Sequence, residues 1–174
     1  MTAPFVDPDT IDNPTANQPI TPEWGDTVND GLLTLAQPPM CVALLNSAQS
    51  LTNNTTTAIN FNTETLDTDA FHSTVSNTSR ITVPSGLGGW YVVGAGITYA
   101  TNGTGNRVLQ VRVNGTTAME GTTWTGTVSS SNTIGGIPVL LNAGDYVEFL
   151  AYQNSGSGLN ITAARGWVRM AAWS

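Results

Sequence analysis

The sequence predicts an all-β fold built as an antiparallel sandwich, and three observations lead to this prediction. Thr, Asn, Ser and Gly are abundant while charged residues make up only 10% of the chain, a composition that suits short strands and tight turns. Beyond residue 40, apolar and polar residues alternate in several short segments, as in half-buried strands. Turn signals recur there about every ten residues with no helical periodicity between them, which is typical of a sandwich.

The alternation places the strands in order along the chain. We expect them over residues 41–45, around 58–61, then 91–99, 107–113, 134–141, 146–153 and 161–173. Asn114-Gly115 follows the fourth of these segments and is a strong signal for a two-residue hairpin turn. The 174 residues suit one compact domain, since domains usually run to about 100–200 residues.

Three motifs in a fixed order indicate a particular sandwich. They are Arg80-Ile81-Thr82-Val83-Pro84 leading into Gly89-Trp90-Tyr91-Val92-Val93, then Leu141-Asn142-Ala143-Gly144-Asp145-Tyr146-Val147, then Gly166-Trp167. Together they resemble the tumour necrosis factor-like jelly roll, which includes the globular head of the first complement component, over roughly residues 40–174. An additional Gly-Leu pair at Gly86 and Leu87 stretches the usual spacing between the first motif and its aromatic strand.

The version of this head found in bacteriophage structural proteins is more similar still. That resemblance rests on Glu64, Asp67, Asp69, His72, the Arg80 motif, Asn106-Arg107 and Asn114-Gly115. Heads of this family assemble as threefold trimers, so the resemblance implies a closed homotrimer.

The last predicted strand has two different faces. One carries Ala164, Gly166, Val168 and Met170, which suit a packed interior; the other carries Arg165, Trp167, Arg169 and Trp173. Arginine stacks on aromatic planes and keeps directed hydrogen bonds when partly desolvated, and Trp and Arg are enriched at protein interfaces. We therefore take the second set as candidates for the trimer interface.

Residues 1–39 are expected to form an arm distinct from the head at 40–174. Five prolines before residue 23 favour an extended chain, and Thr21-Pro22 is typical of the start of a helix, which we predict over about 22–36. Its apolar stripe comprises Trp24, Val28, Leu32 and Leu35. The stripe would pack on the chain's own β domain, or form a stalk or foot inserted into a larger particle.

Charge is unevenly distributed along the chain. The chain has no lysine and five arginines, and six of its seven net negative charges, namely Asp7, Asp9, Asp12, Glu23, Asp26 and Asp30, lie before residue 37. An acidic arm on a nearly neutral head argues against nucleic-acid binding, which depends on basic groups. The acidic residues either dock the arm onto a basic protein surface or only solvate it.

Few residues are suited to catalysis. His72 lies in a polar segment and Cys41 in an apolar one, so we expect a turn histidine and a buried structural thiol instead of a nucleophile pair. Nucleophile-elbow, phosphate-loop and zinc motifs are absent. We therefore expect a non-enzymatic protein without a cofactor. Glu64, Asp67 and Asp69 would either bind calcium, which requires six to eight oxygens, or form a solvated turn.

These features lead to a functional hypothesis. From the sequence we expect neither a leader sequence nor a membrane-spanning segment, and we therefore expect the chain to fold in the host cytoplasm. We expect a phage virion structural protein, a trimeric capsid decoration protein (a minor capsid or head fibre protein) that binds the major capsid protein or another virion protein through residues 1–39. The alternative is a tail-associated module that binds a receptor or a host glycan through Trp124 or Tyr152.

Overall fold

The computed structural model describes residues 25, 29, 32, 37–124 and 131–173. The chain divides into two compact units, Met1–Pro39 and Met40–Ser174. In the first unit, Gly25, Asn29 and Leu32 have helical backbone, but the described residues do not make up a helix. The helix over 22–36 therefore stays a prediction.

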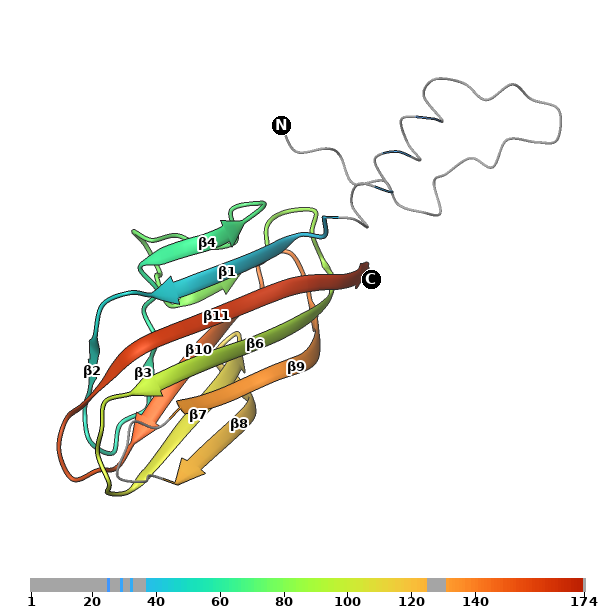
Figure 1. The fold of residues 1–174 in the computed structure, drawn as a ribbon. Helices are drawn as coiled ribbons and strands as arrows, with labels where there is room; N and C mark the ends of the chain where they lie inside the picture. Colours follow the sequence, from blue (N-terminus) through green and yellow to red (C-terminus); the bar gives the residue numbers. More distant parts are fainter. Residues whose placement is uncertain (1–24, 26–28, 30–31, 33–36, 125–130, 174) are drawn as a thin grey trace, which may run out of the picture. The chain divides into compact units, whose positions relative to one another are not determined.

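The second unit is a sandwich of two antiparallel sheets (Figure 1). Sheet A has the order β4-β1-β11-β6-β9, with β2 also paired to β11, and sheet B has the order β3-β10-β7-β8, with β5 also paired to β10. The strands of sheet A are β1 (Met40–Leu45), β2 (Gln49–Leu51), β4 (Thr63–Asp67), β6 (Gly89–Tyr99), β9 (Ser131–Leu141) and β11 (Leu159–Trp173). Those of sheet B are β3 (Thr57–Ala58), β5 (Arg80–Thr82), β7 (Asn106–Val113), β8 (Thr116–Trp124) and β10 (Tyr146–Gln153). The predicted antiparallel sandwich is confirmed.

The core lies between the sheets because successive side chains of a strand point to opposite faces. Along β11, Gly166 and Val168 face inward, and the facing strand of sheet B contributes Phe149. A methyl group at position 166 would lie 2.7 Å from ring carbons of both Phe149 and Phe61. Glycine therefore allows the two sheets to close over these rings.

One predicted strand is wrong. The segment around 58–61 is a crossing between the sheets, in which Thr57–Ala58 belongs to sheet B and the chain re-enters sheet A at Thr63. Ile59 and Phe61 are buried, and their N–H groups donate to the carbonyl oxygens of Phe149 and Thr78. Ile59 and Phe61 are two residues apart because both side chains are buried in the core, and this spacing is the same as the period of a strand.

Strands β2, β4, β5 and β8 were not among the predicted strands, although the turn before β8 was predicted. Asn114 and Gly115 have φ values of 50° and 81°, the left-handed pair that a two-residue hairpin between β7 and β8 requires. The Thr-rich β8 that follows lacks the apolar alternation that would have identified it.

The first two sequence motifs are hydrogen-bonded to each other. The Val83 N–H donates to the carbonyl oxygen of Asp145, and the Gly144 N–H donates to that of Val83. The Asp145 carboxylate accepts from the Asn142 N–H at 2.7 Å and from the Asn114 side-chain amide at 2.8 Å. One aspartate thus connects the turn before β10 to the β7–β8 hairpin.

The inserted pair at Gly86 and Leu87 has a local role. Gly86 takes a φ of 79°, which favours glycine, and the Leu87 N–H donates back to Pro84. The hydroxyl of buried Tyr91 donates to the Leu87 carbonyl at 2.6 Å. The added residues therefore supply the acceptor that this buried phenol needs.

Arg107 is fully buried at one end of the sandwich. Its guanidinium donates to the carbonyl oxygens of Asn102, Thr104 and Asn106 and lies 5.6 Å from the ring centre of Tyr99. Burial lowers the pKa of this arginine. The arginine holds the loop before β7 in place, and its burial leaves it inaccessible to a binding partner.

Asp145→Asn is predicted to destabilise the head in a pH-dependent way. The hydrogen bonds from Asn142 and Asn114 lower the pKa of Asp145, so its carboxylate stabilises the fold above the ordinary aspartate pKa of about 3.9. That stabilisation is lost as pH falls through the lower folded-state pKa. Melting curves should show a lower Tm for the variant at neutral pH and a gap that closes in acid. A gap of constant size would contradict this account, and Asp69→Asn serves as the control.

Candidate interaction surface

The outer face of β11 carries the residues predicted for the trimer interface. Arg165 and Arg169 are exposed and Trp167 is half-buried, whereas the residues between them, Gly166 and Val168, are buried. The predicted alternation is therefore confirmed over this stretch. Trp173 ends β11 opposite Gly89, and its side chain lies outside the described residues. The role of all four residues in a trimer stays a prediction.

Neighbouring strands extend this surface across sheet A. Strand register places three rows of side chains over the outer face. The rows are Met40, Arg169, Val92 and Pro138; then Leu66, Val42, Trp167 and Gly94; then Thr63, Leu44, Arg165, Gly96 and Thr133. We call these positions, with Trp90 and Leu140 at one end, the outer face of sheet A.

Trp167 lies flat across the neighbouring strand because of a glycine. A Cβ atom at Gly94 would lie 2.5 Å from the indole Cζ2 of Trp167 and 2.8 Å from the carbonyl oxygen of Ile134. The same indole carbon is 3.8 Å from the Cβ position of Gly135 on β9. The ring therefore spans from β11 over β6 to β9 and is held in one orientation before any partner arrives.

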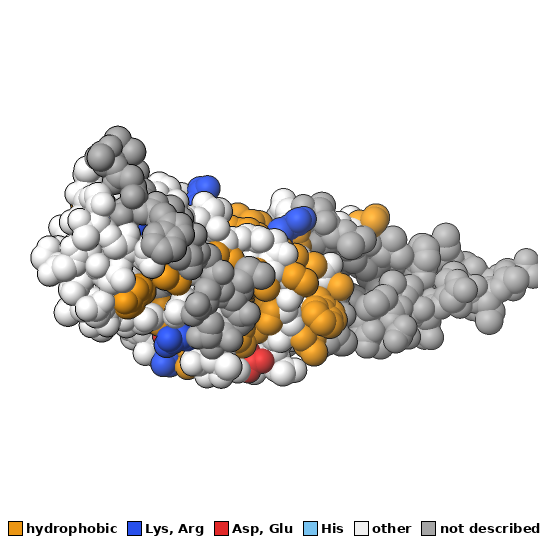
Figure 2. Space-filling model, turned by 90° about the horizontal axis from the view of Figure 1, so that it is seen from below, with side chains coloured by type: hydrophobic (Ala, Val, Ile, Leu, Met, Phe, Trp, Pro, Cys, Tyr) orange, Lys and Arg blue, Asp and Glu red, His pale blue; other side chains and the backbone are white. Residues whose placement is uncertain are grey.

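Large apolar side chains on this face are exposed. Trp90 and Leu140, which pair across β6 and β9, are each 46% exposed, and Leu66 is 41% exposed. Figure 2, which views the molecule from below the orientation of Figure 1, shows hydrophobic side chains along the middle of the visible surface, with arginine and acidic side chains near them. The sequence analysis missed these three residues, although the alternation Trp90, Tyr91, Val92, Val93 could have placed Trp90 opposite the buried Tyr91.

The charge on the outer face of sheet A has one sign. Arg165 and Arg169 stand on it, and none of its described positions is Asp or Glu. The other described arginines are engaged elsewhere, since Arg80 stacks on Tyr146 at 4.1 Å and pairs with Glu148. The surface therefore combines apolar groups with guanidinium groups that no described residue neutralises, and Trp and Arg are enriched at protein interfaces.

His72 is not the turn histidine that we predicted. Its side chain is fully buried, with Nδ1 2.6 Å from Glu64 and Nε2 3.0 Å from the Thr78 carbonyl oxygen. Both partners are acceptors, so only an imidazolium donates to both at once. Its ring also meets Phe61 edge-on. The polar neighbours of His72 in sequence concealed a buried link between β4 and the loop before β5.

Cys41 is the buried thiol that the sequence predicted. Burial raises the pKa of its thiol, and the nearby negative charges of Asp67 and Glu64 raise it further. The thiol therefore remains protonated at neutral pH, and a protonated thiol is a poor nucleophile.

The three carboxylates considered for calcium have partners within the protein. Glu64 pairs with His72, Asp67 accepts the N–H groups of Phe71 and His72, and Asp69 accepts the Thr68 hydroxyl. Among the described residues, no group of three or more His, Cys, Asp or Glu side chains is placed to hold a metal ion. The described contacts thus favour a hydrogen-bonded turn.

The residues considered for a receptor lie on sheet B. The hydroxyl of half-buried Tyr152 donates to the Asn54 side chain, while the side chain of Trp124 lies outside the described residues. Trp24, Val28 and Leu35 of the predicted anchor also lie outside them, and Leu32 is exposed. No helix in the described part of the chain has the length and apolar character needed to cross a membrane.

Comparison with solved structures shows what this sandwich is similar to. The globular domain of the zebrafish complement 1qA protein matches 78% of this chain and 99% of its own, with a TM-score of 0.58 and 15% identity. The vertex protein P5 of PRD1 matches over 76% and 97%, with a TM-score of 0.57 and 16% identity. The Eiger tumour necrosis factor of S. frugiperda matches over 78% and 96%, with a TM-score of 0.51 and 12% identity.

The fold is a tumour necrosis factor-like jelly roll. At such low identity these likenesses establish the fold alone, and they confirm the fold that the three motifs predicted. No protein-family model matches the sequence, and no curated protein matches it.

Gly94→Ala is predicted to displace the Trp167 indole and to cost about 1–3 kcal/mol of stability, as overpacking does. The near-UV circular dichroism should change because the ring must leave β6. In a Trp167→Ala background the same substitution should cost less, but not nothing, because the Ile134 carbonyl remains close. Equal losses of unfolding free energy in both backgrounds, measured by urea denaturation, would show that the indole does not occupy the space over Gly94.

Proposed function

We propose that the chain is a non-enzymatic structural protein that assembles as a homotrimer through the outer face of sheet A. One observation carries the proposal. This face leaves Trp90, Leu140 and Leu66 exposed beside Trp167 and two arginines that pair with no described residue. Contiguous exposed apolar surface marks interaction sites, and each large apolar side chain covered would contribute roughly 1.5–3 kcal/mol. A closed ring of copies covers such a face on every subunit.

We further infer that the trimer is part of a bacteriophage virion and decorates its capsid. The likeness to the vertex protein of PRD1, a phage protein, supports a structural role in a particle. The engagement of Cys41 and His72 in the fold also favours a structural role over a catalytic one. A threefold head matches threefold and local threefold positions on a capsid shell.

In this proposal residues 1–39 attach the head to the virion, through Trp24, Val28, Leu32 and Leu35 and through the acidic residues before residue 37. An acidic segment suits a basic patch on the major capsid protein or another virion protein. Nucleic acid is not the expected partner, because Arg80 and Arg107 are held within the head.

Light scattering is predicted to give a mass three times the chain mass of 18.2 kDa. Leu140→Asp should reduce the mass to that of one chain, because it places a charge in the covered surface, and its circular dichroism should remain that of a folded head. Val75→Asp is the matched control, since Val75 is 91% exposed and lies in the loop before β5, outside the strands that form this face. A single-chain mass for the unmodified protein would refute the trimer.

Deletion of residues 1–36 is predicted to abolish attachment to capsids while leaving the mass of the head unchanged. The two units of the chain are compact separately, so the head should remain folded. Co-sedimentation of purified full-length and shortened protein with undecorated capsids measures attachment. Equal decoration by the two proteins would exclude the arm as the anchor.

A further inference from the structure

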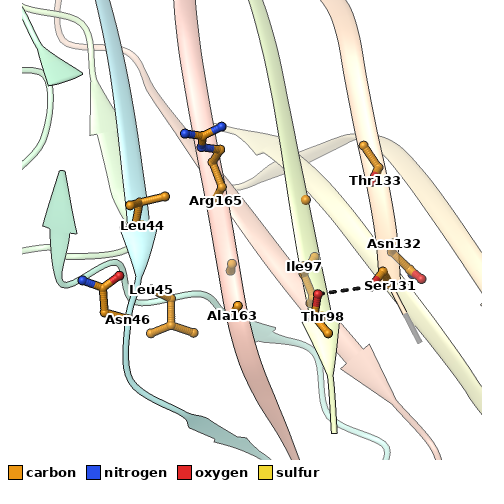
Figure 3. A pocket seen from close by; sticks show the side chains of 12 residues that line it. Leu44, Leu45, Asn46, Ile97, Thr98, Ser131, Asn132, Thr133, Ala163 and Arg165 are labelled. Carbon is orange, nitrogen blue, oxygen red and sulfur yellow. Dashed lines mark hydrogen bonds between the residues drawn. The ribbon is translucent and has the colours of Figure 1, made fainter. Parts of the chain in front are cut away.

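A hollow of about 400 Å³ opens on the outer face of sheet A. It lies over Gly96, where the absence of a side chain leaves space between β11 and β9: a Cβ atom there would meet only Thr133 Oγ1, at 3.8 Å. Figure 3 shows Leu44 and Arg165 on one side of it and Thr98, Ser131 and Thr133 on the other. Gly94 is covered by the Trp167 indole, but the corresponding space at Gly96, one row away, is open.

The lining of this hollow is suited to negative charge. Arg165 is exposed and forms no hydrogen bond or ion pair with any described residue. Thr98 and Ser131 share a hydrogen bond of 3.1 Å, which uses one of their two hydroxyl protons and leaves the other to donate outward. Thr133 adds a third hydroxyl, and none of the lining residues is acidic.

Self-association would make the unpaired charge more costly. If three copies cover this face, as the proposed function requires, the trimer brings six guanidinium groups together from Arg165 and Arg169, with no carboxylate on the described face. Charges closer than the Debye length of about 8 Å at physiological salt are poorly screened. A covered guanidinium needs a counter-charge.

We propose that the hollow beside Arg165 binds an anionic group, either an oxyanion such as phosphate or a carboxylate. The planar guanidinium offers two parallel N–H donors to such a group, and the Thr and Ser hydroxyls complete its hydrogen bonding from the opposite side. The floor of the hollow at Gly96 and Ala163 has no polar side chain to hold water that would compete with the anion. The inference rests on the proposed trimer, in which the bound anion neutralises part of the interface charge.

Inorganic phosphate is the probe. Sedimentation equilibrium of the full-length protein, with phosphate replacing chloride at constant ionic strength, should show the dissociation constant of the trimer falling about tenfold for each subunit, the effect of one charge-assisted hydrogen bond in each hollow. Arg165→Gln should abolish this response. Arg169→Gln should keep it, since Arg169 lies on the same face but does not line the hollow. Gly96→Ala, which partly fills the hollow without changing its charge, should weaken the response.

The two possible sources of the anion give different results. If a free ion occupies the hollow, Arg165→Gln weakens the trimer only when phosphate is present. If a carboxylate of a neighbouring chain occupies it, Arg165→Gln weakens the trimer in chloride as well. Either result supports the site. The inference is overturned if Arg165→Gln leaves the dissociation constant unchanged, or lowers it, in both buffers.

A single-chain mass in all conditions would instead refute the proposed trimer. The site itself would then be judged by phosphorus NMR of phosphate with the unassembled protein. Line broadening by the unmodified chain that Arg165→Gln removes would retain the anion site, and no difference between the two would reject it.

Discussion

The alternation of β11 between its two register shifts, over residues 163–170, is the constraint on which the rest of the structure depends. This strand pairs with β1, β2 and β6, so a shift of one residue would exchange its two faces completely. On its inner face Gly166 lets the rings of Phe149 and Phe61 approach. On its outer face Arg165, Trp167 and Arg169 take the adjacent positions. Close packing inside and an arginine-tryptophan surface outside are therefore set by one register.

Two glycines of β6, Gly94 and Gly96, shape the outer face. Gly94 accepts the indole of Trp167, whereas Gly96 leaves a hollow beside Arg165. The face is thus partly organised before assembly, because the tryptophan is already fixed and little side-chain entropy remains to be lost there. The remaining free-energy cost of covering this face is electrostatic, because Arg165 and Arg169 lie on it. An anion at Arg165 would reduce that cost and would tie assembly to the ionic surroundings.

Local sequence signals predicted most of the sandwich because its turns and central strands obey local rules. Asn114-Gly115 and the alternation of β7, β10 and β11 act over a few residues, and all were visible in the sequence. The crossing at Ile59 and Phe61 imitates a strand, since burial can impose a two-residue period without sheet pairing. Whereas the alternation around Trp90 was visible in the sequence, the exposure of Leu140 and Leu66 and the link between His72 and Glu64 depend on which strands become neighbours. Neither could be derived from sequence spacing.

The central claim is that copies of this chain cover the outer face of sheet A. Hydroxyl-radical footprinting of the assembled protein, analysed residue by residue with mass spectrometry, tests it most directly. The account predicts that Trp90, Leu140 and Leu66 are protected in the native protein and become reactive on dilution to single chains, while the exposed Val75 reacts equally in both. Reactivity of these three residues that is high and independent of concentration would contradict it.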